Sequence, residues 1–277
     1  MKYWQDKVVV VTGGSSGLGL VLSQSFAAAG CQVIMAARGQ EQGTQAVKTI
    51  ETGNARFVAT DVTDSASVNQ LVENVIQQEG RIDAWVNNAG RSSRGLAQET
   101  SVEEFEELLQ LNFIALARCS QAAIPHLTKS RGHLVNIGSL SSKTASPYMG
   151  GYAASKYPVA AYSQQLRLEH SSRSLHVLLV APGPIRRPDS TPRYQDQSRD
   201  LPETAGKPGG GVKLKGICPQ RLADKIMRAC QRRKPELVVP GYARFLFALA
   251  QLCPGWGDWI VRKMTGSRGA KQVHNED

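Results

Sequence analysis

Short runs of β-branched residues alternate along the chain with longer segments in which apolar residues recur at helical spacing. The first run, KVVVV, leads through a glycine-rich stretch into LGLVLSQSFAAAG, which has the periodicity of an amphipathic helix. Six further strands are expected, at Gln32–Ala37, Arg56–Ala59, Ile82–Asn87, the run HLVNI, Leu175–Ala181 and Glu236–Val239. This repeated order of strand and helix predicts a parallel sheet with right-handed crossovers.

Helical periodicity fills the gaps between the strands. Helices are expected at Glu41–Glu51, at Ser65–Gln78, onward from about Val102, through AASKYPVAAYSQQLRLE, and from Pro219 to Arg232. Ser101 and Glu104 form a capping box at the start of the third of these helices. The expected fold is α/β, a doubly wound sheet of seven parallel strands with helices on both faces. The 277 residues, of which 41% are hydrophobic, suit a single domain with a full core.

Three glycines of TGGSSGLG, namely Gly13, Gly17 and Gly19, stand where the first strand gives way to the first helix. Without Cβ atoms the backbone turns sharply there, and the helix amino terminus offers free N–H groups and a positive dipole end. Leu18 completes the turn, and Ser15 and Ser16 add hydroxyl donors. The arrangement is typical of a pyrophosphate site, although glycines also serve ordinary tight turns.

The stretch SLSSKTASPYMGGYAASK carries the candidate chemistry. Tyr152 and Lys156 are four residues apart, so a helix places the phenol and the ammonium on one face. The cation is expected to lower the pKa of Tyr152 from about 10 towards the range of a general acid or base. Ser139 follows HLVNI, which puts its hydroxyl at the carboxyl end of a strand, where open parallel sheets bind ligands. Taken alone, the Tyr-x-x-x-Lys spacing also occurs on ordinary surface helices.

Four motifs, in this order, resemble those of the short-chain dehydrogenase/reductase family in its single-domain branch: TGGSSGLG, NNAG, YAASK and PGPI. The resemblance covers roughly residues 7 to 185, together with the helix and strand near 220 to 239. It implies a Rossmann-type fold, a nicotinamide cofactor and a catalytic set made up of Asn112, Ser139, Tyr152 and Lys156. Besides Tyr152 and Lys156, it implies cofactor contacts from Asp61, Val62, Asn88, Ala89, Gly90, Pro182, Gly183 and Ile185.

The resemblance also implies individual roles. Asp61 would contact the adenine ring, and Asn112 would help to hold a proton-relay water near Lys156. A polar amide in the apolar run LLQLNFIAL is equally compatible with a hydrogen-bonded core position. Family members usually have a threonine or serine shortly after PG to contact the nicotinamide carboxamide, whereas this chain has Arg186 and Arg187.

The end of the second strand indicates which cofactor is used. An acidic residue there binds the ribose 2′-hydroxyl of NAD, whereas an arginine accommodates the 2′-phosphate of NADP. This chain has Arg38. NADP(H) is therefore expected in preference to NAD(H), the alternative being that Arg38 is a solvated loop residue. No metal site is expected, because the few histidines are dispersed and the five cysteines show no C-x-x-C spacing.

Positive charge is concentrated towards the carboxyl end. Residues 183–277 contain 18 Lys and Arg against 9 Asp and Glu, whereas residues 1–182 contain 15 against 14. The basic residues form no recognition motif, which argues against nucleic acid and favours an acidic partner, an anionic substrate or a membrane surface. The segment 186–216, rich in proline and glycine, is expected to be an active-site lid rather than a disordered segment.

The extension at 242–277 contains YARFLFALAQLC, which is apolar nearly all round. It is similar to the carboxy-terminal extension of membrane-associated reductases of steroid, retinoid and sphingoid ketones. It could fold onto its own domain, form a subunit interface, or dock on a membrane through Trp256 and Trp259 beside Arg262 and Lys263. The amino terminus lacks the apolar region of a signal peptide, so we expect a cytoplasmic protein, peripheral to a membrane in the docking alternative. We also expect a homodimer or homotetramer.

Together these features predict an NADP(H)-dependent oxidoreductase that interconverts a ketone and a secondary alcohol. Its small-molecule substrate would be a hydrophobic, steroid-, retinoid- or sphingoid-like carbonyl compound. One alternative is a 3-oxoacyl-carrier-protein reductase, which the basic lid favours and the apolar tail disfavours. Another is a non-catalytic NADP-sensing binding protein, which the intact pair of Tyr152 and Lys156 disfavours.

Overall fold

The computed structural model describes residues 3–170, 174–186, 194, 196–199, 201–207 and 209–265. Its centre is a sheet of seven strands, β1 (Val8–Thr12), β2 (Gln32–Ala37), β3 (Ala55–Ala59), β4 (Ala84–Asn87), β5 (His133–Ile137), β6 (His176–Pro182) and β7 (Glu236–Val239). Neighbouring strands all pair in parallel, in the order β3-β2-β1-β4-β5-β6-β7. The predicted doubly wound, seven-stranded α/β fold is confirmed.

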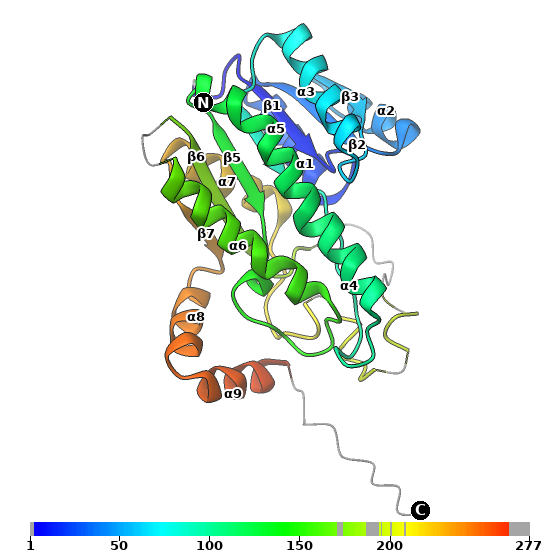
Figure 1. The fold of residues 1–277 in the computed structure, drawn as a ribbon, viewed down its shortest axis with the longest axis vertical. Coiled ribbons are helices and arrows are strands. Elements are labelled where there is room, and N and C mark those ends of the chain that lie inside the picture. The colour runs from blue at the N-terminus through cyan, green and yellow to red at the C-terminus, as the bar shows by residue number, and fades with distance from the viewer. Residues whose placement is uncertain are drawn as a thin grey trace, which may run out of the picture.

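Nine α-helices lie in the described ranges, and Figure 1 shows their arrangement about the sheet. They are α1 (Gly17–Ala28), α2 (Gln40–Lys48), α3 (Ser65–Glu79), α4 (Val102–Leu109), α5 (Ala115–Lys129), α6 (Tyr152–Glu169), α7 (Pro219–Gln231), α8 (Ala243–Leu252) and α9 (Pro254–Thr265). Two shorter helical segments are η1 (Gln110–Ile114) and η2 (Leu140–Ser142).

Both faces of the sheet are covered by helices. Successive side chains of a strand point to opposite faces, so the valines of β1 supply two separate cores. Val9 and Val11 pack in a cluster with residues of α1 and α7. Val8 and Val10 belong to a second cluster, with residues of α3 and α5. Burial on both sides explains why this strand is an unbroken apolar run rather than an alternating one.

The strand order reverses direction at β1, which lies between β2 and β4. In open parallel sheets a crevice forms at the carboxyl ends of the strands at such a point, and ligands bind there. Beyond β7 the chain continues into α8 and α9, which project from the end of the sheet in Figure 1. Among the described residues, no helix is both long and apolar enough to cross a membrane.

Two helices differ from the sequence prediction by more than a one-residue shift of a boundary. The helix expected to reach Glu51 ends at Lys48, where the Thr49 hydroxyl donates to the Ala46 carbonyl, 2.7 Å away. The helix expected to run on from Val102 contains a π-helical turn, η1, between α4 and α5. A π-helical turn adds a residue to the local repeat and often marks a functional position. Here it carries Asn112.

Candidate active site

A cavity of about 1260 Å³ opens at the carboxyl end of the sheet. Most of the predicted site residues line it: Gly13, Ser16, Gly17, Leu18, Asn88, Ala89, Gly90, Ser139, Tyr152, Lys156, Pro182, Gly183 and Ile185. Six predicted residues are not part of its wall: Ser15, Gly19, Arg38, Asp61, Val62 and Asn112. Gly19 packs behind Gly13, and Asn112 packs behind Gly90.

Two turns, after β1 and after β4, meet at the floor of the cavity. The Thr12 hydroxyl joins them by accepting from the backbone N–H groups of Asn88, at 3.0 Å, and Ala89, at 3.1 Å. Gly13 has a φ of 62°, and a Cβ atom there would lie 3.2 Å from the Ala89 Cα. Glycine adopts this conformation without strain, and a Cβ atom here would press on the turn after β4. The floor is therefore largely bare backbone, which fits a cofactor that must lie close to the chain.

The amino terminus of α1 faces the cavity. Its cap, Ser16, is exposed and makes no side-chain capping bond, and the first turn contains no acidic residue. The first N–H groups of a helix have no partner within that helix. They and the Ser16 hydroxyl therefore fit the phosphates of a dinucleotide.

Arg38 and Asp61 lie side by side at one edge of this site, because they follow the paired strands β2 and β3. The Asp61 carboxylate accepts bonds from the backbone N–H and the hydroxyl of Thr63, at 2.9 and 2.6 Å. Those bonds, helped by the charges of Arg38 and Arg118, hold the pKa of Asp61 below its ordinary value. Arg38 is exposed, so its guanidinium is accessible to an anion.

The opposite wall carries the predicted catalytic residues. Tyr152 is the first residue of α6, and Lys156 lies one turn further on. The Lys156 ammonium is buried and donates to the Ile137 carbonyl at 3.1 Å. Ser139 follows β5 and caps η2, its Oγ accepting from the Ser141 N–H at 3.0 Å. The Ser139 side chain is also hydrogen-bonded to Tyr152. The structure therefore brings Ser139, Tyr152 and Lys156 together.

The acidity of Tyr152 differs from the sequence prediction. Burial raises the pKa of Tyr152, and this outweighs the hydrogen bond with Ser139, which lowers it. The cation whose charge lowers the pKa of Tyr152 is Arg94, not Lys156 as we expected. Lys156 is itself so buried that its pKa falls to about 8. Its charge is therefore only partly present at mildly alkaline pH, and Tyr152 is a phenol at neutral pH.

Asn112 links the turn after β4 to α6 by hydrogen bonds. Its Oδ1 accepts from the Arg91 N–H at 2.9 Å, and its Nδ2 donates to the Arg91 carbonyl at 2.9 Å and to the Ser155 hydroxyl at 2.8 Å. A Cβ atom at Gly90 would lie 2.7 Å from Asn112 Oδ1 and 3.4 Å from Lys156 Nζ, so both polar atoms face that glycine. The π-helical turn thus supports Asn112 as a positioning residue, and its predicted contact with a relay water stays a prediction.

Arg94, which the sequence analysis missed, ties the segment after β4 to the predicted lid. It is buried, and its Nε donates to the Ala205 carbonyl at 2.8 Å. Its guanidinium stacks on the Tyr194 ring, 3.9 Å from the centroid, and its backbone N–H donates to Gln197 Oε1 at 3.2 Å. Tyr194, Gln197 and Lys207 line the cavity. The described parts of the lid segment therefore lie over the candidate site.

Backbone hydrogen bonds also join the two ends of the lid segment. Arg186 N–H donates to the Ile217 carbonyl at 2.8 Å, and Ile217 N–H donates to the Pro184 carbonyl at 2.8 Å. Arg187, at the position where the family usually has a carboxamide-binding hydroxyl, lies outside the described residues. Ordering of the lid on ligand binding stays a prediction.

Replacing Arg94 by methionine is expected to move to higher pH the alkaline limb of the pH–rate profile of a reaction that uses the Tyr152 phenol as an acid. Such a reaction needs the protonated phenol, and loss of the Arg94 charge raises the pKa of that phenol. We would measure kcat/KM against pH for Arg94→Met, for Arg94→Lys, which keeps the charge, and for the control Arg91→Met. A limb that stays in place in Arg94→Met, or moves equally in Arg94→Lys, contradicts an electrostatic role.

The α8–α9 hairpin forms the apolar end of the cavity. Leu246, Phe247, Ile260, Val261 and Met264 line it. The helices approach closely because Gly257 is buried against Ala250. The hairpin also leaves large apolar side chains exposed that do not line the cavity, and these are Phe245, Leu252, Trp256 and Trp259. One side of the extension therefore covers the cavity, and another side is exposed.

Comparison with known proteins identifies the family. The model of the short chain dehydrogenase family matches residues 7–198. The chain is 35% identical over 288 aligned residues to dehydrogenase/reductase SDR family member 7B of Danio rerio, with 99% of this chain and 89% of that protein covered. It is 34% identical over 180 residues to the 3-ketodihydrosphingosine reductase of Bacteroides thetaiotaomicron, with 65% and 64% covered.

A solved short-chain dehydrogenase from Streptomyces avermitilis superposes with a TM-score of 0.75 at 27% identity, with 93% of this chain and 96% of that chain covered. The chain belongs to the short-chain dehydrogenase/reductase family, as the four motifs predicted. It is therefore an oxidoreductase of a family that uses a nicotinamide cofactor.

Proposed function

We propose that the protein is an NADP(H)-dependent reductase of hydrophobic ketones, which also oxidises the corresponding secondary alcohols. The observation that carries this proposal is the convergence of Ser139, Tyr152 and Lys156 on a cavity whose other end is the apolar α8–α9 hairpin. An apolar wall favours the binding of a substrate with a large hydrocarbon body, because binding removes apolar surface from water. The similarity to a 3-ketodihydrosphingosine reductase supports the same substrate class.

A nicotinamide held in the cavity would supply the hydride, and residues of the wall would bind the carbonyl oxygen and supply its proton. Ser139 and Tyr152 are placed to hydrogen-bond a carbonyl oxygen, which polarises the bond. Because burial raises the pKa of Tyr152, its hydroxyl is protonated at neutral pH and is ready to donate to the developing alkoxide. The same shift disfavours oxidation at neutral pH, since oxidation requires the phenolate. Lys156, buried beside this wall, is placed to bind the nicotinamide ribose.

NADP in preference to NAD is supported by the exposed Arg38 after β2 and by the absence of an acidic residue at that strand end. A panel of ketones, assayed by the loss of NADPH absorbance, tests the whole proposal. Turnover of long-chain or polycyclic ketones with NADPH supports it. A purified, folded protein that binds NADPH and turns over no ketone contradicts it.

A second candidate is the reduction of 3-oxoacyl groups on a carrier protein. The observation that favours it is the presence of Lys207 and Lys213 on the cavity wall, since a carrier phosphopantetheine arm bears a phosphate. A 3-oxoacyl-carrier substrate belongs in the same assay. Preference for the carrier-bound substrate over the free hydrophobic ketone favours this second candidate.

The outer surface of the hairpin fits contact with an anionic membrane. Trp256 and Trp259 are exposed, and Lys263 lies over the Trp259 ring, 4.9 Å from its centroid. Arg244 and Arg262 are exposed on the same two helices. Aromatic rings beside cations are typical of a headgroup boundary. Because the hairpin also walls the cavity, such contact would bring the apolar end of the cavity close to the lipid.

We expect the protein to bind anionic vesicles and to release them at high salt. Each basic residue near such a surface contributes about 1 kcal/mol, so three of them favour anionic over neutral vesicles by roughly 100-fold. Co-sedimentation of Trp256→Ala/Trp259→Ala, with Leu168→Ala on α6 as an exposed apolar control, tests the surface. Loss of binding in the double variant alone supports docking. No vesicle binding by the parent, together with an oligomer that the double variant dissociates, assigns the surface to a subunit interface.

A further inference from the structure

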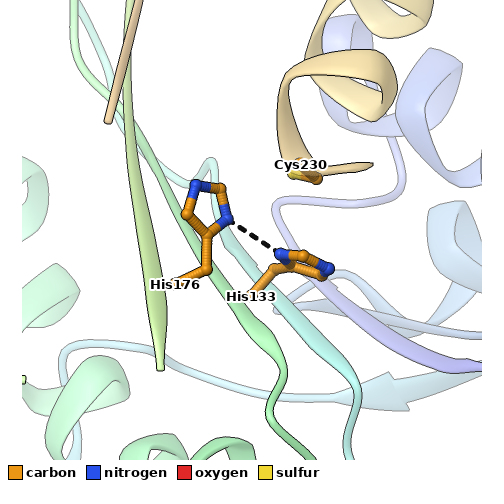
Figure 2. Close-up of side chains that lie close together, drawn as sticks. All are labelled: His133, His176 and Cys230. Atoms are coloured by element: carbon orange, nitrogen blue, oxygen red, sulfur yellow. Dashed lines mark hydrogen bonds between the residues drawn. The ribbon is translucent and has the colours of Figure 1, made fainter. Parts of the chain in front are cut away.

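Two histidines and a cysteine meet at the end of the sheet opposite the cavity. His133 and His176 are the first residues of β5 and β6 and are register partners. Cys230 reaches them from the last turn of α7, as Figure 2 shows. All three are buried, and one donor atom from each lies within 4.8 Å of the other two. The proposed oxidoreductase function uses none of them.

The hydrogen bonds of the pair define its protonation. His176 Nε2 is 2.8 Å from the Lys234 carbonyl, which can only accept, so this nitrogen carries hydrogen. Both rings are buried, which favours the neutral form of an imidazole. His176 Nδ1 is therefore a lone pair, and His133 Nδ1–H donates to it at 2.8 Å. His133 Nε2 then accepts from the Tyr3 hydroxyl at 2.6 Å.

A single hydrogen thus occupies the space between the two Nδ1 atoms, beside the Cys230 thiol. If that hydrogen moves to His133 Nε2, the Tyr3 oxygen can accept it, and both Nδ1 atoms then carry a free lone pair. Each outer ring nitrogen would then donate to an oxygen already in place. Metal-bound histidines are usually held in this way. Metal–donor distances of about 2.0–2.3 Å require donor separations of about 3.4–3.8 Å, so only small side-chain rotations are needed.

The net charge of the buried metal site determines which metal ion it favours. The cluster is buried, and Arg233 and Lys7 already place positive charge near His133. Copper(I) and one thiolate together are neutral, whereas zinc(II) and one thiolate leave a buried positive charge that is costly. Soft thiolate ligands and a site with two histidines and one cysteine both suit copper. We infer that His133, His176 and Cys230 form a binding site for a copper(I) ion that joins β5, β6 and α7.

Binding of one copper(I) ion releases one proton. The Cys230 S–H bond breaks, its proton leaves to solvent, and the sulfur lone pair bonds to copper. The hydrogen on His133 Nδ1 moves to Nε2 of the same ring and stays in the protein. No electron is transferred, because copper enters and remains as copper(I). The site therefore needs a source of Cu⁺ but no oxidant or reductant.

The test is an anaerobic titration of the whole protein with Cu⁺ supplied as its bicinchoninate complex. One copper per chain, held in competition with the chelator and with one proton released, is expected. Cys230→Ser removes the thiolate ligand and should weaken binding by more than the about 10- to 100-fold that loss of an outer-shell partner costs. Cys253→Ser, which removes an exposed thiol on the hairpin, should leave binding unchanged.

X-ray absorption of the copper-loaded parent keeps the test independent of how well a variant folds. Two nitrogen neighbours and one sulfur neighbour at the copper support the site. Copper bound as tightly by Cys230→Ser as by the parent contradicts it, as does a parent that takes no copper from the chelator. Equal or tighter binding of Zn²⁺ contradicts the argument from charge.

Discussion

Replacing Tyr152 by phenylalanine is expected to reduce turnover by about 100- to 10,000-fold, the usual contribution of a general acid or base, and to leave NADPH affinity nearly unchanged. The ring continues to pack at the start of α6, so the wall of the cavity keeps its shape. What disappears is the hydroxyl to which the proposed mechanism assigns proton donation. Titrating NADPH and measuring turnover in one preparation separates the two effects.

Tyr157→Phe is the matched control, because Tyr157 lies on the same helix and is exposed. It removes a phenol hydroxyl without touching the site and should leave turnover unchanged. Near-normal turnover in Tyr152→Phe would remove Tyr152 from its role. Equal loss in both variants would indicate a general disturbance of α6 instead.

Replacing Arg38 by alanine is expected to weaken NADPH much more than NADH. A hydrogen bond to a charged group contributes roughly 1.5 to 3 kcal/mol, which is roughly 10- to 150-fold in affinity. Only NADPH carries the 2′-phosphate, so the loss should be confined to it. Arg38 is exposed, and its charge already acts on Asp61, so it lies beside the predicted adenine contact.

Lys48→Ala is the control, since Lys48 is an exposed cation at the far end of α2. This substitution lowers the net charge by one, as Arg38→Ala does. It should alter the two affinities little and equally. If Arg38→Ala weakens NADH as much as NADPH, the phosphate is bound elsewhere and the preference for NADP loses its basis.

The parts of the fold and the site that the sequence predicted depend on local signals. The φ of 62° at Gly13 and its closeness to Ala89 both favour glycine, and such a preference is visible as a motif. Tyr152 and Lys156 share a helix, so their spacing alone places them together. The seven strands were expected within a residue or two of their observed bounds because burial on both faces leaves continuous apolar runs.

The parts that were missed depend on contacts between distant segments. Arg94 acts through Tyr194 and Ala205, about a hundred residues further along the chain. His133 and His176 looked dispersed, but the register of β5 and β6 places them side by side. The acidity of Tyr152 was predicted with the wrong sign because spacing shows a neighbouring cation and does not show burial. Spacing gives neighbours along a helix, whereas burial and strand register come only from the assembled fold.

The central claim is that this cavity transfers hydride from NADPH to a hydrophobic ketone, with Tyr152 as the proton donor. Incubation with NADPH that carries deuterium at both C4 positions and a mixture of long-chain and polycyclic ketones tests it most directly, with mass spectrometry of the alcohols formed. The account predicts one deuterium on the carbinol carbon of a product made by the parent and not by Tyr152→Phe. Alcohol without deuterium, or the same labelled alcohol from both proteins, would contradict it.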